Sequence, residues 1–335
     1  MVEENKLSII VSAYNEGKNI SKCLYSLQNQ QGEYKYEVII VDDGSKDESV
    51  SIMDNYAQKN DNFKVIHKKN GGSISARYEG AKNASGNYIT LIDGDDFVSK
   101  DYVKTVYSII NENKAEFYIL NDFVTDSIKK SFRLDKQFLD SINYLSMEEA
   151  YNWVLTGKAG NVWDKIYKTK ELCKALKDNI SRIFYGEDIY INVLYLAHVT
   201  KVKVENKAIY YHYVSSPTSG SITQKNFKKI DDINAVYLKV YYLYQNGYIS
   251  KNNLNDYLNM YISNIAEIVG DLIKLGVKNK KISKHLTELV ITNQGLKIIQ
   301  PINFKKQIYI WCIKNKYFYV LFLINRLKIK NNFGV

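Results

Sequence analysis

The first hundred residues alternate between short apolar runs and segments with apolar residues at helical spacing. The apolar runs cover 7–12, 36–43, 63–67 and 87–92, and they are rich in Ile and Val. Between them, apolar residues recur every three or four positions over 15–28, 50–56 and 73–85. Continuous apolar strands that alternate with helices indicate βαβ units and a mostly parallel sheet covered on both faces. The pattern therefore predicts an α/β fold.

Beyond residue 96 the pattern is less regular. It predicts a helix over 101–111, a strand over 116–121, an irregular stretch to about residue 147, and short strands over 201–205 and 207–213. From about residue 225 onward only helical spacing remains. Ser, Pro and Gly cluster just before that point, which favours a domain boundary there. We therefore expect an α/β domain over 1–223 and a helical C-terminal domain over 224–335.

Composition indicates an ordinary globular protein. Hydrophobic residues make up 45% of the 335 residues, which is enough for a substantial core. The three cysteines are far apart in the sequence and predict neither a disulfide framework nor a CxxC metal site. The first residues do not resemble a signal peptide, and no run reaches the ~18 apolar residues of a membrane-spanning helix. We therefore expect a cytoplasmic location.

Charge is distributed unevenly along the chain. Residues 1–110 carry 13 Lys and Arg against 16 Asp and Glu, a balance of −3, whereas 250–335 carry 14 against 4, a balance of +10. The segment 303–333 interleaves basic, aromatic and aliphatic residues. One interpretation is a helix that packs on the rest of the chain or on a second copy in a homodimer. The other is a peripheral membrane contact, with the basic residues facing anionic headgroups. We expect no nucleic-acid partner, because the rest of the chain offers no nucleic-acid module.

Acidic or polar clusters follow three of the predicted strands, at 12–16, 41–47 and 91–96. In open α/β sheets ligands bind beyond the carboxyl ends of the strands, so these clusters mark a candidate site. Asp93, Asp95 and Asp96 repel one another, and a divalent cation would offset that repulsion. Mg²⁺ and Mn²⁺ accept one or two carboxylates together with phosphate oxygens. The alternative is a turn that caps the helix starting near Asp101.

Two further acidic pairs have comparable alternatives. Asp42 and Asp43 end the second strand, where a carboxylate can accept from a nucleobase N–H or a ribose hydroxyl; the alternative is a helix-capping loop around Ser45. Glu187 and Asp188 begin an amphipathic helix. Acidic residues suit a helix N-terminus through the macrodipole alone. The functional interpretation makes one of them a general base beside an acceptor hydroxyl.

Taken together, these motifs resemble glycosyltransferase family 2, whose members have the GT-A fold. The similarity runs from about residue 7 to residue 223 through "SAYNEGKNI", "EVIIVDDGSKDES", "NGGSISARYEGAKNASGNYITLIDGDD", "NVWDKIYK", "YGEDIYIN" and "YYHYVSSPTSGSIT". Two positions depart from the family pattern. Ala13 stands where proline is usual, and Tyr78 stands where asparagine is usual, which puts the contact of that asparagine in doubt.

The resemblance implies roles in binding a nucleotide-sugar donor. The first nucleotide-binding loop of the family is matched by Ala13, Tyr14 and Glu16. The pair that contacts uracil and ribose is matched by Asp42 and Asp43. Arg77 matches a basic residue near the donor's phosphates or base. Trp163 and Lys165 match a block near the sugar pocket, although a packed aromatic and a surface lysine would explain them nearly as well.

The resemblance also implies the chemistry. Asp93, Gly94 and Asp95 match the metal motif for Mn²⁺ or Mg²⁺, with Asp95 the expected direct ligand and Asp96 a neighbour that shares the role. Asp188 matches the catalytic base, with Glu187 beside the acceptor. The implied reaction moves a sugar from a nucleotide diphosphate, with UDP favoured, to a hydroxyl of a glycan or lipid-linked glycan, with inversion. The rival interpretation is a non-catalytic module that binds sugar nucleotides.

Overall fold

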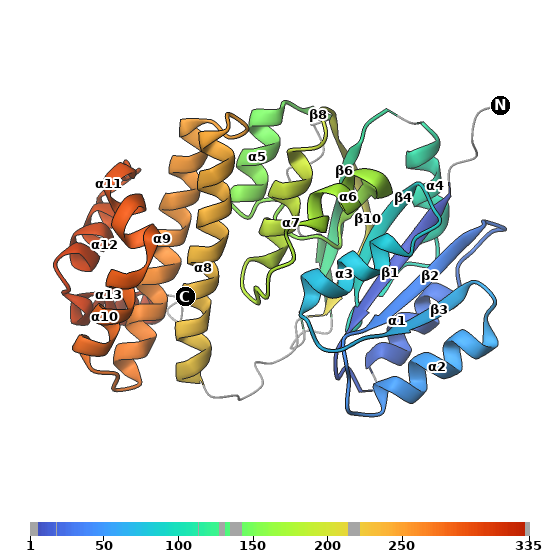
Figure 1. Cartoon of the computed structure of the whole chain (residues 1–335), viewed down its shortest axis with the longest axis horizontal. Helices are drawn as coiled ribbons and strands as arrows, with labels where there is room; N and C mark the ends of the chain where they lie inside the picture. The colour runs from blue at the N-terminus through green and yellow to red at the C-terminus, as the bar shows by residue number, and fades with distance from the viewer. Residues whose placement is uncertain are drawn as a thin grey trace. The chain divides into compact units, whose positions relative to one another are not determined.

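The computed structural model describes residues 6–17, 19–112, 114–126, 131–134, 143–213 and 222–331. The chain forms two compact units (Figure 1). The first comprises Met1–Ile183 and Glu187–Pro217, and the second comprises Phe184–Gly186 and Thr218–Val335. The residues just before the predicted boundary at 223/224, 214–221, lie outside the described part of the chain, so that boundary stays a prediction.

The first unit is built on one mixed, mostly parallel sheet in the order β3-β2-β1-β4-β9-β6-β10-β5. Its bounds are β1 Leu7–Ala13, β2 Tyr36–Asp42, β3 Phe63–His67, β4 Tyr88–Asp93, β5 Phe97–Val98, β6 Phe117–Asp126, β9 Lys165–Lys168 and β10 Val202–Tyr213. Two short strands, β7 (Ser131–Leu134) and β8 (Tyr144–Leu145), pair with β6 and β10. The strands β1 to β4 are parallel, whereas β9 runs antiparallel between β4 and β6. The α/β class is therefore confirmed.

Some elements differ from their prediction. The expected strands over 201–205 and 207–213 form one strand, β10, whose register with β6 shifts twice. The antiparallel strand β9 was not predicted. The first helix, α1 (Asn19–Gln28), begins four residues later than expected, because Asn15 and Gly17 have φ values of 54° and 51°. Such left-handed conformations cannot continue an α-helix.

Helices cover both faces of the sheet. On one face, α1, α2 (Ser49–Lys59) and α4 (Tyr102–Asn111) share a core with every second residue of the strands, such as Ile9 and Val11. On the other face lie α3 (Ser73–Lys82), α5 (Met147–Leu155), α6 (Thr169–Lys177) and α7 (Glu187–Leu196). Here α3 packs closely on β1, because a Cβ built on Gly80 would lie 2.5 Å from the Ile10 side chain. Because helices cover both faces of the sheet, its strands need apolar residues on both sides, which explains their continuous apolar sequences.

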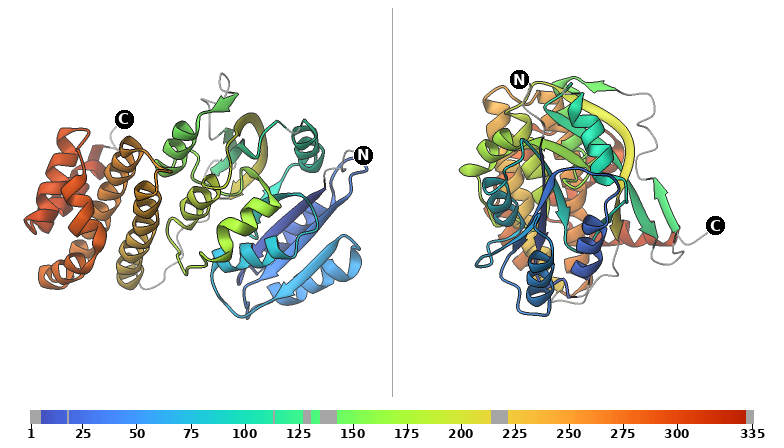
Figure 2. Two further views of the ribbon diagram at one scale, coloured as in Figure 1. Left: turned by 45° about the horizontal axis from the view of Figure 1, so that its top comes forward. Right: turned by 90° about the vertical axis from the view of Figure 1, so that its right-hand side faces the viewer.

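Every secondary-structure element assigned in the described residues of the second unit is a helix, as the sequence predicts for this part of the chain. Its helices are α8 (Ile222–Gln245), α9 (Lys251–Lys274), α10 (Asn279–Glu288), α11 (Leu296–Ile298), α12 (Phe304–Lys314) and α13 (Phe318–Asn331), with a π-helical turn η2 (Ile291–Gly295) before α11. The helices α8 and α9 lie side by side, and α12 and α13 pack on α9 (Figure 2). No helix in the described part of the chain is long and apolar enough to cross a membrane.

Candidate active site

The sheet register brings the three predicted strand-end clusters to one edge. Ala13 at the end of β1 lies opposite Asp42 of β2, and Ser12 lies opposite Asp93 of β4. Backbone bonds continue this order into the loops, because Asp43 N–H donates to the Ala13 carbonyl (2.9 Å) and Gly94 N–H donates to the Ser12 carbonyl (3.0 Å). The loops after three neighbouring parallel strands therefore start from one place, where α/β folds bind ligands.

In the loop after β1, Tyr14 is exposed and Glu16 turns toward the acidic turn after β4. Burial raises the pKa of Glu16 to about 7, and repulsion from Asp95 and Asp93 adds to the rise. Gly17 N–H donates to Asp47 Oδ2 (2.9 Å) and to Ser49 Oγ (2.8 Å), which fixes this loop on the loop after β2.

Asp42 is buried and its carboxylate is held on both oxygens. Ser45 N–H donates to Oδ1 at 2.8 Å, and the His67 Nδ1 lies 2.9 Å from Oδ2. The second ring nitrogen of His67 lies 2.9 Å from Asp54 Oδ1, so each nitrogen faces a carboxylate. These bonds raise the pKa of His67 and, against the effect of burial, lower the pKa of Asp42. An anionic Asp42 is a suitable acceptor for a nucleobase N–H.

Asp43 fixes the loop that leads into α3. Its carboxylate accepts from Gly71 N–H (2.9 Å), Gly72 N–H (2.7 Å) and Lys68 Nζ (2.6 Å). Gly72 has a φ of 89°, which favours glycine at this position. The structure therefore gives Asp43 a structural task, and a ribose contact would share an oxygen that is already bonded.

The turn after β4 places three carboxylates in different surroundings. Asp96 is buried, and its Oδ2 accepts from the Tyr210 hydroxyl at 2.5 Å and lies 3.2 Å from His212 Nδ1. Burial, followed by repulsion from Asp96 and Asp93, raises the pKa of Asp95 to about 6. A Cβ on Gly94 would lie 3.2 Å from that of Ala13, so the close approach of the β1 and β4 loops needs a small residue here.

Arg77, from α3, joins the predicted metal motif to the expected base. One guanidinium nitrogen donates to Asp93 Oδ1 at 2.8 Å and the other donates to Asp188 Oδ1 at 2.7 Å. The arginine side chain is only 3% exposed, and its Nε has no hydrogen-bond partner among the described residues. Burial alone would lower the pKa of Arg77, but attraction to Asp93 and Asp188 raises it overall. Residues 77, 93 and 188 thus form one charged group.

Glu187 and Asp188 stand in the first turn of α7. Burial and repulsion from Asp188 raise the pKa of Glu187 to about 8. Burial also raises the pKa of Asp188, and the guanidinium of Arg77 opposes that rise. Arg77 donates directly to Asp188, so its charge favours the ionised form of Asp188 over that of Glu187, whose raised pKa favours a bound proton near neutral pH.

The block at 161–168 lies beside this group. Trp163 stacks on His212 with ring centres 4.7 Å apart, and its Nε1 donates to Asp122 Oδ2 at 3.3 Å. Lys165 is fully buried and forms an ion pair with Asp164. The simple interpretation of Lys165 as a surface lysine is therefore wrong, and that of Trp163 as a packed aromatic agrees with its ring contacts.

Several residues of the site were not singled out from the sequence. They are His67, Lys68, Asp122, Asp164, Tyr210 and His212. His67 ends β3, the next strand of the sheet, and Lys68 directly follows it. Extending the rule that ligands bind beyond strand ends to β3 would have found both residues. His212 and Tyr210 lie in the "YYHYVSSPTSGSIT" block, whose pairing with the turn after β4 depends on an antiparallel contact of β10 with β5.

The donor set suits a hard divalent cation that also binds phosphate. Among the described residues, no three His, Cys, Asp or Glu side chains gather as a ready metal cluster. Mg²⁺, however, usually takes only one or two protein carboxylates and completes its shell with water and substrate phosphates. Within the described chain, Asp95 forms no hydrogen bond or ion pair with another residue, whereas Asp93 and Asp96 do. Asp95 is therefore the carboxylate best able to take a metal.

Comparison with known proteins agrees with the fold and motifs. The model of the family described as "Glycosyl transferase family 2" matches residues 8–175. The glycosyltransferase GlyA of Streptococcus pneumoniae is 30% identical over 226 residues, which cover 64% of this chain and 31% of GlyA. The putative glycosyltransferase EpsH of Bacillus subtilis is 31% identical over 168 residues, or 50% of this chain and 48% of EpsH. The chain thus spans less than half the length of these curated relatives.

Solved structures show the same architecture. The crystal structure of Staphylococcus aureus TarS 1–349 in complex with UDP-GlcNAc aligns with a TM-score of 0.65 at 18% identity. The alignment covers 96% of this chain and 92% of that one. The sheet order and helices found here are therefore those of a GT-A fold, and the chain belongs to glycosyltransferase family 2.

Proposed function

We propose that the chain is an inverting, metal-dependent glycosyltransferase. Its donor is a nucleotide-diphosphate sugar, with a UDP-sugar favoured, and its acceptor is a hydroxyl of a glycan or lipid-linked glycan in cell-surface polysaccharide synthesis. The observation that carries this proposal is the link through Arg77, which holds the expected base and the metal motif within one hydrogen bond of the same guanidinium.

The residues support a division of tasks. Asp188 is the group that accepts the proton of the attacking hydroxyl, and Arg77 opposes the rise in the pKa of Asp188 that burial causes. Glu187 holds a proton near neutral pH and serves to orient the acceptor. Mn²⁺ or Mg²⁺, held by Asp95 with Asp93 and Asp96 nearby, would neutralise charge on the departing diphosphate. Tyr14, Asp42 and Asp43 then face the nucleoside, and Trp163 with His212 borders the sugar side.

The names of relatives support the acceptor class. One relative is a poly(ribitol-phosphate) beta-glucosyltransferase of Bacillus spizizenii, 37% identical over 114 residues, which cover 33% of this chain and 18% of that protein. Another is a cholesterol galactosyltransferase of Borreliella burgdorferi, 28% identical over 241 residues, or 67% of this chain and 63% of that protein. Both names describe transfer of a hexose to a non-nucleotide acceptor, one polymeric and one lipidic. A hydroxyl acceptor on a polymer or a lipid is the shared chemistry.

Release of UDP from a panel of UDP-sugars, with Mn²⁺ or with a chelator, tests the proposal. We expect Asp188→Asn to lower turnover by at least about 100-fold, the lower end of general-base effects, while UDP affinity changes little. Asp178→Asn, an exposed carboxamide substitution in the same unit, serves as the control. Near-normal turnover of the Asp188 variant would show that the base is assigned wrongly.

The second candidate is a module that binds sugar nucleotides without catalysis. The unusual pKa values of Glu187 and Asp95 speak against it, because a binding surface has no need of desolvated, mutually repelling carboxylates. Binding of a UDP-sugar by calorimetry without any UDP release, in the presence of metal and acceptor extracts, would favour this candidate.

A further inference from the structure

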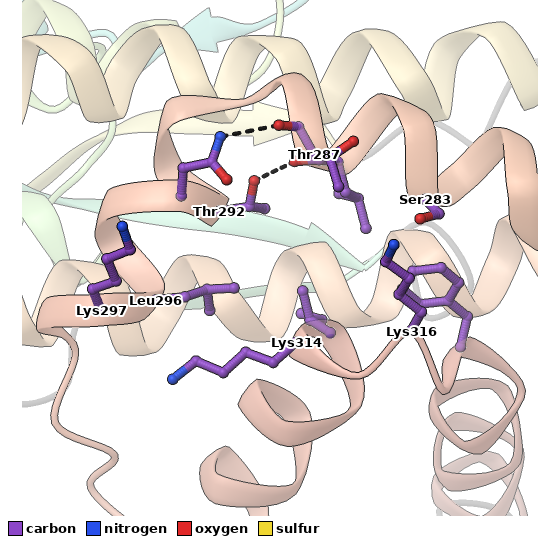
Figure 3. A pocket seen from close by; sticks show the side chains of 11 residues that line it. Ser283, Thr287, Thr292, Leu296, Lys297, Lys314 and Lys316 are labelled. Carbon is purple, nitrogen blue, oxygen red and sulfur yellow. Dashed lines mark hydrogen bonds between the residues drawn. The ribbon is translucent and has the colours of Figure 1, made fainter.

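The helical unit contains a pocket of about 240 Å³ between α10, η2, α11, α12 and the start of α13 (Figure 3). Its apolar lining consists of Leu286, Leu296, Ile313 and Phe318. Three lysines stand around this lining, Lys297, Lys314 and Lys316. In Figure 3, Lys297 and Lys314 lie toward one end of the pocket, and Lys316 lies toward the other, near Ser283. Cationic groups thus stand at both ends of an apolar floor.

None of the three pocket lysines forms an ion pair within the described part of the chain. The sequence after Glu288 contains no acidic residue at all, so the segment that supplies all three lysines offers no counter-charge. An uncompensated group of cations draws anions to a surface.

Two exposed aromatic residues are close in sequence to the pocket lysines. Trp311 and Tyr317 are 53% and 52% exposed, and their rings stack with centres 4.8 Å apart. Trp311 precedes Lys314 by three residues on α12, so the two side chains share one side of the helix. Tyr317 follows Lys316 directly. Indole and phenol rings beside lysines are typical of protein surfaces that lie in the headgroup region of a bilayer.

We propose that this face of the helical unit docks on an anionic phospholipid surface, with Lys297, Lys314 and Lys316 on headgroup phosphates and Trp311 and Tyr317 in the interface. A symmetric contact with a second copy would place this lysine group against itself, which like-charge repulsion opposes. The inference is independent of sugar transfer, because it uses no residue of the candidate active site. It selects the membrane interpretation of 303–333 and extends it to Lys297 of α11; residues 332 and 333 lie outside the described chain.

Co-sedimentation of the full chain with vesicles tests this docking. The vesicles contain phosphatidylcholine alone or phosphatidylcholine with an equal amount of phosphatidylglycerol. Each lysine near an anionic surface contributes about fivefold in affinity, so the Lys297→Gln, Lys314→Gln, Lys316→Gln triple variant should lose on the order of 100-fold. Trp311→Ala should lose about tenfold through its buried apolar area. The triple variant Lys251→Gln, Lys274→Gln, Lys278→Gln removes the same charge from exposed positions of the same unit and is the matched control.

Binding of the wild type to anionic vesicles, retained by the control and lost by the pocket variant, supports the proposal. Equal loss in both triple variants overturns it, because binding would then follow net charge alone. A thermal shift with inorganic phosphate that depends on the three lysines, without vesicle binding, also overturns it and assigns the pocket to a free phosphate ligand. Far-UV circular dichroism of each variant shows that the chain is folded, and because vesicle binding does not require UDP, its outcome is separate from that of the proposed function.

Discussion

Replacing Arg77 by methionine tests the charged group at the centre of the candidate site. The side chain keeps much of its length and loses its charge, which leaves Asp93 and Asp188 facing each other without a cation. Two unit charges at about 4 Å attract by about 4 kcal/mol at an effective dielectric constant of ~20. The bonds at 2.8 and 2.7 Å thus contribute about 8 kcal/mol together. Dehydration of the buried guanidinium offsets several kcal/mol of this gain. We expect a net loss of about 3 kcal/mol, within the range for breaking a buried pair.

The same change should alter the pH dependence of turnover. Arg77 opposes the rise in the pKa of Asp188, so its loss raises that pKa further. A base with a higher pKa is protonated over a wider range, and the acid limb of the kcat profile should move to higher pH. A residue that only contacts the donor's phosphates would instead raise the KM for the donor and leave the limb in place.

Urea denaturation and UDP-release kinetics across pH measure both effects, with Arg182→Gln, an exposed arginine substitution, as the control. The double variant with Asp188→Asn completes a cycle that isolates the coupling between the two residues. A coupling energy near zero, together with an unmoved acid limb, would refute the reasoning.

Two further changes follow from the carboxylates of the site. Burial and like charges raise the pKa of Asp95 above its usual value, so its ionisation lowers stability as pH rises through about 6. Without metal, Asp95→Asn should therefore raise the free energy of unfolding by about 2 kcal/mol at about pH 8 and leave it unchanged near about pH 4. Mn²⁺ should stabilise the wild type and not the variant. A gain of equal size at both pH values would contradict this. The raised pKa of His67 means that its ion pairs stabilise the fold fully below about pH 6.5 and are lost as pH rises through the raised value. His67→Gln should therefore weaken UDP binding most at low pH, as calorimetry would show against exposed His198→Gln; a pH-independent loss would argue against a charged His67.

The fold and the residues of the candidate site could be predicted from the sequence to different extents. The parallel strands β1 to β4 could be predicted from their apolar runs, because strands buried on both faces are continuously apolar. The strand β9 could not be predicted, because four residues of "KIYK" carry no periodicity, and only their place between β4 and β6 makes them a strand. The bonding of Arg77 was equally beyond prediction, since it joins α3 to α7 across 111 positions of the chain. Motifs identified which residues gather, and three-dimensional packing determined which of them touch.

The three hydrogen bonds of Asp43 have a consequence for the order in which ligands bind at the site. This carboxylate holds the two glycines from which α3 starts, and α3 carries Arg77 less than two turns later. A ribose hydroxyl that approached Asp43 would compete with those amides, so binding of the nucleoside at the start of α3 would affect the position of the Arg77 guanidinium in the middle of this helix. This coupling of Asp43 to Arg77 through α3 would favour binding of the nucleotide first and of the acceptor second.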